Sequence, residues 1–111
     1  MSRAYEMTVT VTEHNFKRKP AIITACKKEW DFEPHKTIKG EIYLSGESCL
    51  CGGETEDEFA QRLSGAIWNA NRGFCRISLQ ATYLEDPPSE LHEPDENDYE
   101  EWKASVRKSN P

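Results

Sequence analysis

Every second residue from position 5 to position 11 is apolar, and the residues between them are threonine or glutamate. This alternation predicts a strand with one buried face. Two further apolar stretches, at residues 21–30 and 38–44, are separated by charged segments that each contain a proline. We expect the three stretches to form an antiparallel meander, because short connections join neighbouring antiparallel strands.

A helical pattern follows at residues 56–70. Thr55 is a favourable N-cap residue, and Glu58, three positions later, can return a hydrogen bond to the cap backbone. Apolar residues then recur at spacings of three and four, and Gly73 lies just beyond the pattern, where helices favour glycine. Strict alternation returns at residues 75–83 and predicts a fourth strand, which Pro87 and Pro88 terminate.

The predicted order is therefore β-β-β-α-β, an α+β domain of two layers in which the central helix packs on one face of the sheet. We expect a compact domain at residues 1–84, an acidic linker with prolines at 85–97, and a short amphipathic helix with the terminus at 98–111. The helical part, which begins at Asp98 and ends near Arg107 and Lys108, is shorter than the roughly 12 to 15 residues that an isolated helix needs in water. Trp102 must therefore dock on this domain or on a partner if the helix persists.

The formal net charge of −6 comes from one segment of the 111-residue chain. Residues 1–84 carry equal numbers of acidic and basic residues, whereas residues 85–101 carry nine carboxylates and no lysine or arginine. Such a block often only solvates a chain. It could instead be steered to a basic protein surface and anchored by its aromatic residues, or fold back on Lys17 to Lys19. The candidate partner-binding residues are Glu93, Asp95, Glu96, Asp98, Tyr99 and Trp102.

Positive charge gathers in the first third of the chain, which gives an alternative function. A shared sheet edge would let these residues contact phosphates while neighbouring aromatic rings stack on bases. Acidic residues lie among them and the domain is neutral, so nucleic-acid binding ranks second. The candidate contacts are Lys17, Arg18, Lys19, Lys27 and Lys28.

Four cysteines raise the question of a metal or thiol site. Cys49 and Cys51 could supply two thiolates, but the single residue between them is shorter than the gap of zinc-binding pairs. A thiol or zinc function there is a third alternative, and we predict no metal and no cofactor. Cys26 and Cys75 fall within apolar patterns, where cysteine behaves as a small hydrophobic residue.

The sequence contains no convergent acid, base, nucleophile or metal cluster, so we do not expect an enzyme. The leading hypothesis is a non-enzymatic protein-binding, adaptor or inhibitor module, similar in composition to small accessory proteins of bacteria and their mobile elements. No stretch approaches the roughly 20 apolar residues of a membrane span, and the first residues lack the apolar run of a signal peptide. We therefore expect a cytoplasmic protein with reduced thiols and no membrane partner. The oligomeric state stays open.

Overall fold

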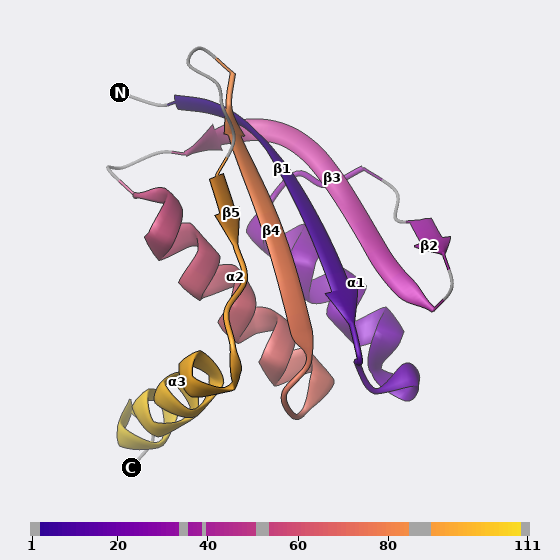
Figure 1. Ribbon diagram of the computed structural model, residues 1–111, viewed down its shortest axis with the longest axis vertical. Helices are drawn as coiled ribbons and strands as arrows, with labels where there is room; N and C mark the ends of the chain where they lie inside the picture. Colours follow the sequence, from indigo (N-terminus) through magenta and orange to yellow (C-terminus); the bar gives the residue numbers. More distant parts are fainter. Residues whose placement is uncertain (1–2, 34–35, 39, 51–53, 85–89, 110–111) are drawn as a thin grey trace.

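Five strands form one antiparallel sheet in the order β2-β3-β1-β4-β5 (Figure 1). The computed structural model describes residues 3–33, 36–38, 40–50, 54–84 and 90–109. Along the chain the elements are β1 (Arg3–Thr12), a 3-10 turn η1 (Phe16–Arg18), α1 (Lys19–Glu29), β2 (Lys36–Ile38), β3 (Glu41–Leu50), α2 (Glu56–Asn71), β4 (Arg76–Tyr83), β5 (Glu90–His92) and α3 (Glu96–Ser109). The predicted α+β class with helices layered on a sheet is confirmed.

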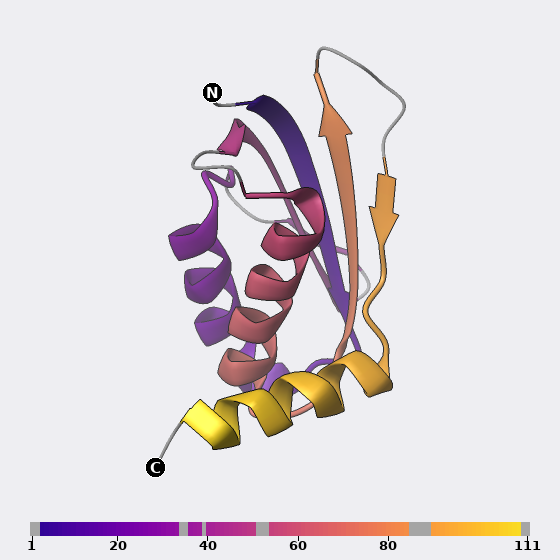
Figure 2. The same ribbon diagram turned by 90° about the vertical axis from the view of Figure 1, so that its left-hand side faces the viewer.

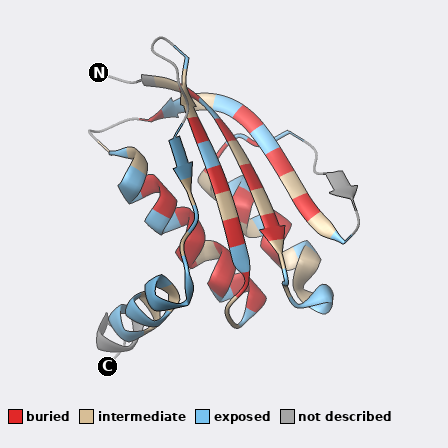
Figure 3. Cartoon of the chain, viewed as in Figure 1, coloured by how far each residue is buried: buried red, intermediate tan, exposed pale blue. Residues whose placement is uncertain are grey.

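The central strand of the sheet is β1, where Val9 lies opposite Leu44 of β3 and Leu79 of β4. These three side chains are buried beneath α1 and α2, which cover the same face of the sheet (Figure 2). The alternation predicted for β1 and β4 is therefore observed, with buried and more exposed positions following one another along each strand (Figure 3). Glu6 and Gln80 are exposed on the opposite face.

The predicted strand at residues 21–30 is wrong, because this segment forms most of helix α1. Pro20 lies in the first turn, a position that helices tolerate because the missing N–H has no helical partner there. Ile22, Ile23 and Cys26 are buried on the face that packs against the sheet, and a short apolar run of this kind does not by itself distinguish helix from strand.

Because of helix α1, the topology of the sheet differs from the predicted meander. The first strands do not form a meander, because α1 connects β1 to β2 and β3 then lies between those two strands. The order β-α-β-β-α-β, with the strands arranged β2-β3-β1-β4, is the split β-α-β connectivity of ferredoxin-like domains. Strand β5 and helix α3 extend this unit.

Helix α2 begins where the sequence predicts and ends at Asn71, one residue beyond the predicted end. The Thr55 hydroxyl accepts a hydrogen bond from the Glu58 N–H, and the Glu58 carboxylate accepts one from the Thr55 N–H. At the other end Arg72 adopts a left-handed conformation, and its N–H donates to the Trp68 carbonyl. Phe59 is fully buried, which contributes about 1.5–3 kcal/mol of hydrophobic stabilisation.

The acidic segment carries more structure than a linker. Strand β5 lies within residues 85–97 and pairs with the edge of β4, with His92 opposite Leu79. Helix α3 then packs on α2: Trp102 lies against Gly65, and Tyr99 meets the Trp68 ring edge-on at 5.3 Å between centroids. Trp102 therefore docks on its own domain. Within the described parts of the chain, no helix combines the length and apolar character needed to cross a membrane.

Candidate functional site

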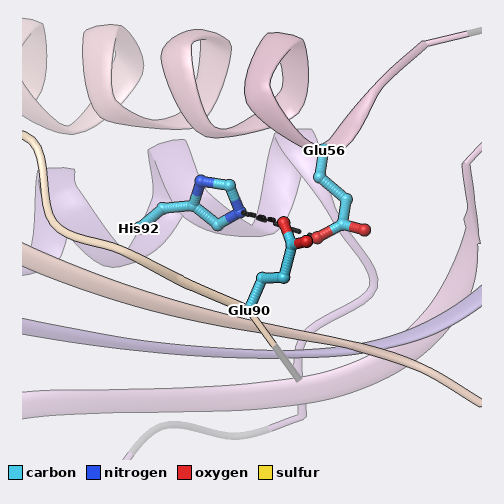
Figure 4. A group of neighbouring side chains, drawn as sticks. All are labelled: Glu56, Glu90 and His92. Atoms are coloured by element: carbon cyan, nitrogen blue, oxygen red, sulfur yellow. Dashed lines mark ion pairs between the residues drawn. The ribbon is translucent and has the colours of Figure 1, made fainter. Parts of the chain in front are cut away.

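A histidine and two carboxylates converge where β5 passes the first turn of α2 (Figure 4). Glu56 is the first residue of α2, and the capping box at Thr55 fixes the start of that helix. Glu90 and His92 are two positions apart on β5 and pair with Ala81 and Leu79 of β4. Because alternate residues of a strand share a face, both side chains lie on the side that faces the helices.

The donor atoms of these residues lie close together. His92 Nε2 is 3.6 Å from Glu56 Oε1 and 3.9 Å from Glu90 Oε2. One potential ligand atom from each of the three residues lies within 4.8 Å of those of the other two. The His92 side chain is 14% exposed and that of Glu56 is 21% exposed, whereas that of Glu90 is 70% exposed, so two of the three residues are partly desolvated and the third reaches the solvent.

Two of these atoms lack hydrogen-bond partners. His92 Nε2 and Glu56 Oε1 are buried and accept or donate no hydrogen bond among the residues that the structure describes. A buried polar atom without a partner costs roughly 1–3 kcal/mol. The two atoms face each other across 3.6 Å, so one bound species could satisfy both.

The opposite ends of the same side chains do have polar neighbours. The Tyr5 hydroxyl donates to Glu56 Oε2 at 2.7 Å, and His92 Nδ1 lies 3.3 Å from Asp57 Oδ1. In metal sites the ligating histidine commonly directs its second nitrogen to a carboxylate, and ligating carboxylates are themselves hydrogen-bonded. Tyr5 and Asp57 therefore occupy the places of such outer partners.

The donor set decides which ion would fit. One imidazole nitrogen with carboxylate oxygens suits first-row divalent ions such as Zn²⁺, Mn²⁺ or Fe²⁺, whereas Ca²⁺ and Mg²⁺ prefer oxygen alone. Bonds to such an ion measure about 2.0–2.2 Å. Donor atoms separated by 3.6 Å and 3.9 Å can surround one ion with small side-chain adjustments.

A cavity of about 400 Å³ adjoins the cluster between α2, the segment that follows β5, and α3. His92 belongs to both the cluster and the cavity wall, and Asp57, which lies next to His92 Nδ1, also lines the cavity. Trp68 and Trp102 form an apolar part of the wall. The remaining acidic lining residues are Glu93, Asp98 and Glu101.

The residues predicted to bind a partner occupy different places. Asp95 caps α3, where its Oδ1 accepts a hydrogen bond from the Asp98 N–H, and Glu96 is exposed in the first turn. Tyr99 and Trp102 pack against the domain core. Glu93 belongs to the cavity wall together with Asp98 and Trp102, so three of the six candidates converge there.

The basic residues do not gather around this site. Arg18 connects η1 to the end of α2, because its Nε donates to the Ala70 carbonyl at 2.8 Å. Lys17 and Lys19 flank it, and Lys27 and Lys28 are exposed near the end of α1. Across the described ranges, no ion pair joins any of them to the carboxylates of α3.

The cysteines fall into two groups. Cys26 and Cys75 are buried, and burial raises the pKa of each thiol to about 12. Cys49 is exposed on β3. Cys51, the second member of the predicted thiol pair, lies outside the described residues.

Sequence reasoning missed Glu56, Glu90 and His92 as a group. The available signal was the Glu90-Leu-His92 spacing, which places two potential ligands on one face of a strand. That spacing has meaning only if the acidic segment pairs with the sheet. No protein-family model, curated protein or solved structure matches the chain.

Proposed function

We propose that the protein binds a divalent first-row transition metal ion through Glu56, Glu90 and His92. The observation that carries this proposal is the pair of buried atoms, His92 Nε2 and Glu56 Oε1, that face each other without hydrogen-bond partners among the described residues. A metal ion bonded to both would satisfy them together. The proposal differs from the cysteine-based zinc alternative in its ligands and in its place in the fold.

The placement of the ligands gives the ion a structural effect. Glu56 belongs to α2, whereas Glu90 and His92 belong to the short edge strand β5. An ion bonded to all three would join the C-terminal segment to the domain and so favour the docked position of α3. Since an ion that binds only the folded chain raises the free energy of unfolding by mass action, occupancy would couple metal concentration to the order of this segment.

A titration of the full chain tests the proposal. After treatment with a chelator and its removal, Zn²⁺ and Mn²⁺ are titrated into the wild-type protein, Glu90→Gln and His92→Asn by calorimetry. Loss of a ligand should weaken binding by more than about tenfold, which exceeds the lower range for loss of an outer partner. Glu100→Gln is the matched control, because Glu100 is exposed on α3 and lies outside the cluster.

Two results would overturn the proposal. One is wild-type protein that takes up neither ion, in which case a protonated His92 acts only as the cationic partner of the surrounding carboxylates. The other is binding that Glu90→Gln and His92→Asn leave unchanged, which would place the ion elsewhere. Circular dichroism of each variant shows whether the fold is retained.

We further propose a second function, that of a non-enzymatic protein-binding, adaptor or inhibitor module. The observation that favours it is the set of exposed carboxylates on α3 and its approach, none of which forms an ion pair with lysine or arginine in the part of the chain that is described. Such a surface attracts a basic protein surface. The carboxylates are Glu93, Asp95, Glu96, Asp98, Glu100 and Glu101.

In this second proposal the aromatic residues do not contact the partner, in contrast to the prediction from the sequence. Tyr99 and Trp102 hold α3 on its own domain, so recognition would rest on the charged outer face of the helix. Affinity capture should retain a basic protein with the wild-type chain and lose it with the double variant Glu96→Gln, Glu100→Gln or at high salt. Retention of the same protein by that variant at high salt would contradict this function.

A further inference from the structure

We propose that the cavity between α2 and α3 binds an organic cation, a primary ammonium or guanidinium group carried on a small apolar body. This proposal is independent of the metal ion. It rests on three properties of the cavity wall: its charge, its aromatic surface and its volume.

The charge of the wall is of one sign. Asp57, Glu93, Asp98 and Glu101 line the cavity, and no lysine or arginine among the described residues does so. None of these four carboxylates forms an ion pair with a lysine or arginine of the described chain, and the only titratable lining residue besides them is His92, next to Asp57. A cleft lined by one sign of charge concentrates ligands of the opposite sign.

The half-buried Trp102 supplies most of the aromatic surface of the wall, because Trp68 is only 2% exposed. Trp68 and Trp102 have ring centroids 5.8 Å apart at an interplanar angle of 52°. Trp68 is held in place because its Nε1 donates to the Cys75 carbonyl at 3.0 Å, and Trp102 lies against Gly65. Tryptophan is the side chain that attracts cations most strongly through its ring face, so the wall combines apolar contact with preference for a positive group.

The volume of the cavity limits the size of the ligand that it can hold. About 400 Å³ lies within the range of small-molecule sites, roughly 300–1,000 Å³, and far exceeds the space that a single coordinated ion needs. The apolar surface of Trp102 would remain uncovered around a small hydrated cation. An amine or guanidine with an attached ring or alkyl chain fills the space and places its charge among the carboxylates.

The ammonium or guanidinium group can belong to a free amine or guanidine, or to the lysine or arginine side chain of a peptide. Binding is measured by calorimetry and by the indole N–H signals in NMR spectra, on the full chain in the presence of a chelator. The probes are phenethylamine, benzylguanidine and a short arginine peptide, with phenylethanol as the neutral control. The chelator excludes the metal ion, so failure here does not bear on the metal site, and failure of the metal site does not bear on the cavity.

Glu101→Gln and Glu6→Gln form a matched pair, because both remove one exposed carboxylate but only Glu101 lines the cavity and Glu6 lies on the opposite face of the sheet. The cationic probes should shift the Trp102 signal, bind more tightly than phenylethanol, and lose at least about fivefold in affinity in Glu101→Gln but not in Glu6→Gln. Stronger binding of the peptide than of free amines assigns the site to a protein side chain, and the reverse assigns it to a free amine. Equal binding of phenethylamine and phenylethanol, equal effects of the two variants, or no binding at millimolar concentration would overturn the proposal.

Discussion

The imidazole of His92 lies 3.6 Å from the carboxylate of Glu56, although one residue ends the last strand of the sheet and the other begins the central helix. The contact exists because β5 adds to the edge of β4 and passes the first turn of α2. Two buried polar atoms without hydrogen-bond partners among the described residues meet there. A tyrosine and an aspartate hold the far ends of the same side chains.

Tyr5→Phe should weaken metal binding without unfolding the protein. The substitution removes the hydrogen bond to Glu56 Oε2 but retains the ring that stacks on Tyr83 at 5.2 Å between centroids. Loss of an outer partner lowers metal affinity by about 10- to 100-fold, and loss of one hydrogen bond costs about 1 kcal/mol of stability. Calorimetric titration with Zn²⁺ measures the first effect. Tyr43→Phe is the control, since the Tyr43 hydroxyl donates to Glu41, away from the cluster, and unchanged affinity in Tyr5→Phe would contradict the assigned role.

Gly65→Ala should release α3 from the domain. A Cβ at this position would lie 2.5 Å from Trp102 Nε1, and overpacking of this kind costs about 1–3 kcal/mol. That cost exceeds the gain of about 1 kcal/mol in helix propensity. Amide hydrogen exchange across residues 96–105 should accelerate, while exchange in β1 stays slow. Gly73→Ala is the control, because nothing lies within 4 Å of its added Cβ; slow exchange of α3 in both variants would show that Trp102 docking does not depend on Gly65.

The two buried thiols should be unreactive in the folded protein. Burial raises the pKa of Cys26 and of Cys75 from 9.0 to about 12, so neither thiol forms the reactive thiolate near neutral pH. Brief treatment with iodoacetamide should label exposed Cys49 first, and mass spectrometry should find Cys26 and Cys75 modified only after denaturation. Rapid labelling of Cys26 in the native protein would contradict its position in the core.

The same thiols predict a loss of stability at high pH. Because the folded pKa lies above the unfolded value, the stabilisation is complete below pH 9.0 and declines as the pH rises toward about 12. Each thiol should add a slope of up to about 1.4 kcal/mol per pH unit in that window. Denaturant unfolding of wild-type protein and of Cys26→Ala, Cys75→Ala between pH 8 and 11 measures it, and equal slopes would contradict the prediction.

The N-cap of α3 predicts a separate effect at low pH. The Asp98 N–H donates to Asp95 and lowers the pKa of that carboxyl below its ordinary value. Its contribution is therefore present above the ordinary value and is lost as the pH falls through the lowered one, below about pH 4. Exchange of α3 amides in wild-type protein and in Asp95→Ala should differ at pH 6 and converge at the lowest pH values. A constant difference across this range would contradict a role for the ionised carboxylate.

Local signals explain which parts of the fold the sequence could predict. The capping box at Thr55 and Glu58 marks the start of α2, and strict alternation marks β1 and β4. Gly73 lies just beyond the helix, but Arg72 takes the left-handed conformation that the sequence pattern assigns to a glycine. Helix α1 was missed because a short apolar run that contains Ile22 and Ile23 fits a strand buried on both faces as well as a buried helix. Pro20, in the first turn, was the signal that favoured a helix.

The candidate site could not be predicted from local sequence patterns, because its contacts join segments that are far apart in the sequence. Three residues of β5 lie in an acidic segment with little hydrophobic content, and they become a strand only because the edge of β4 offers backbone partners. Without that pairing, Glu90 and His92 have no defined relation to Glu56. The docking of Trp102 was foreseen as a requirement of a short helix, whereas its acceptor surface at Gly65 and Trp68 followed only from the fold.

The most direct test of the metal site is a crystal structure of the full chain grown with Zn²⁺, with diffraction data collected on both sides of the zinc absorption edge. If the three residues hold the ion, an anomalous peak lies about 2.0–2.2 Å from His92 Nε2 and from oxygens of Glu56 and Glu90. The peak should disappear in His92→Asn. An anomalous peak at a cysteine instead, or no peak at the three residues while His92 contacts only carboxylates, would contradict the proposed metal site.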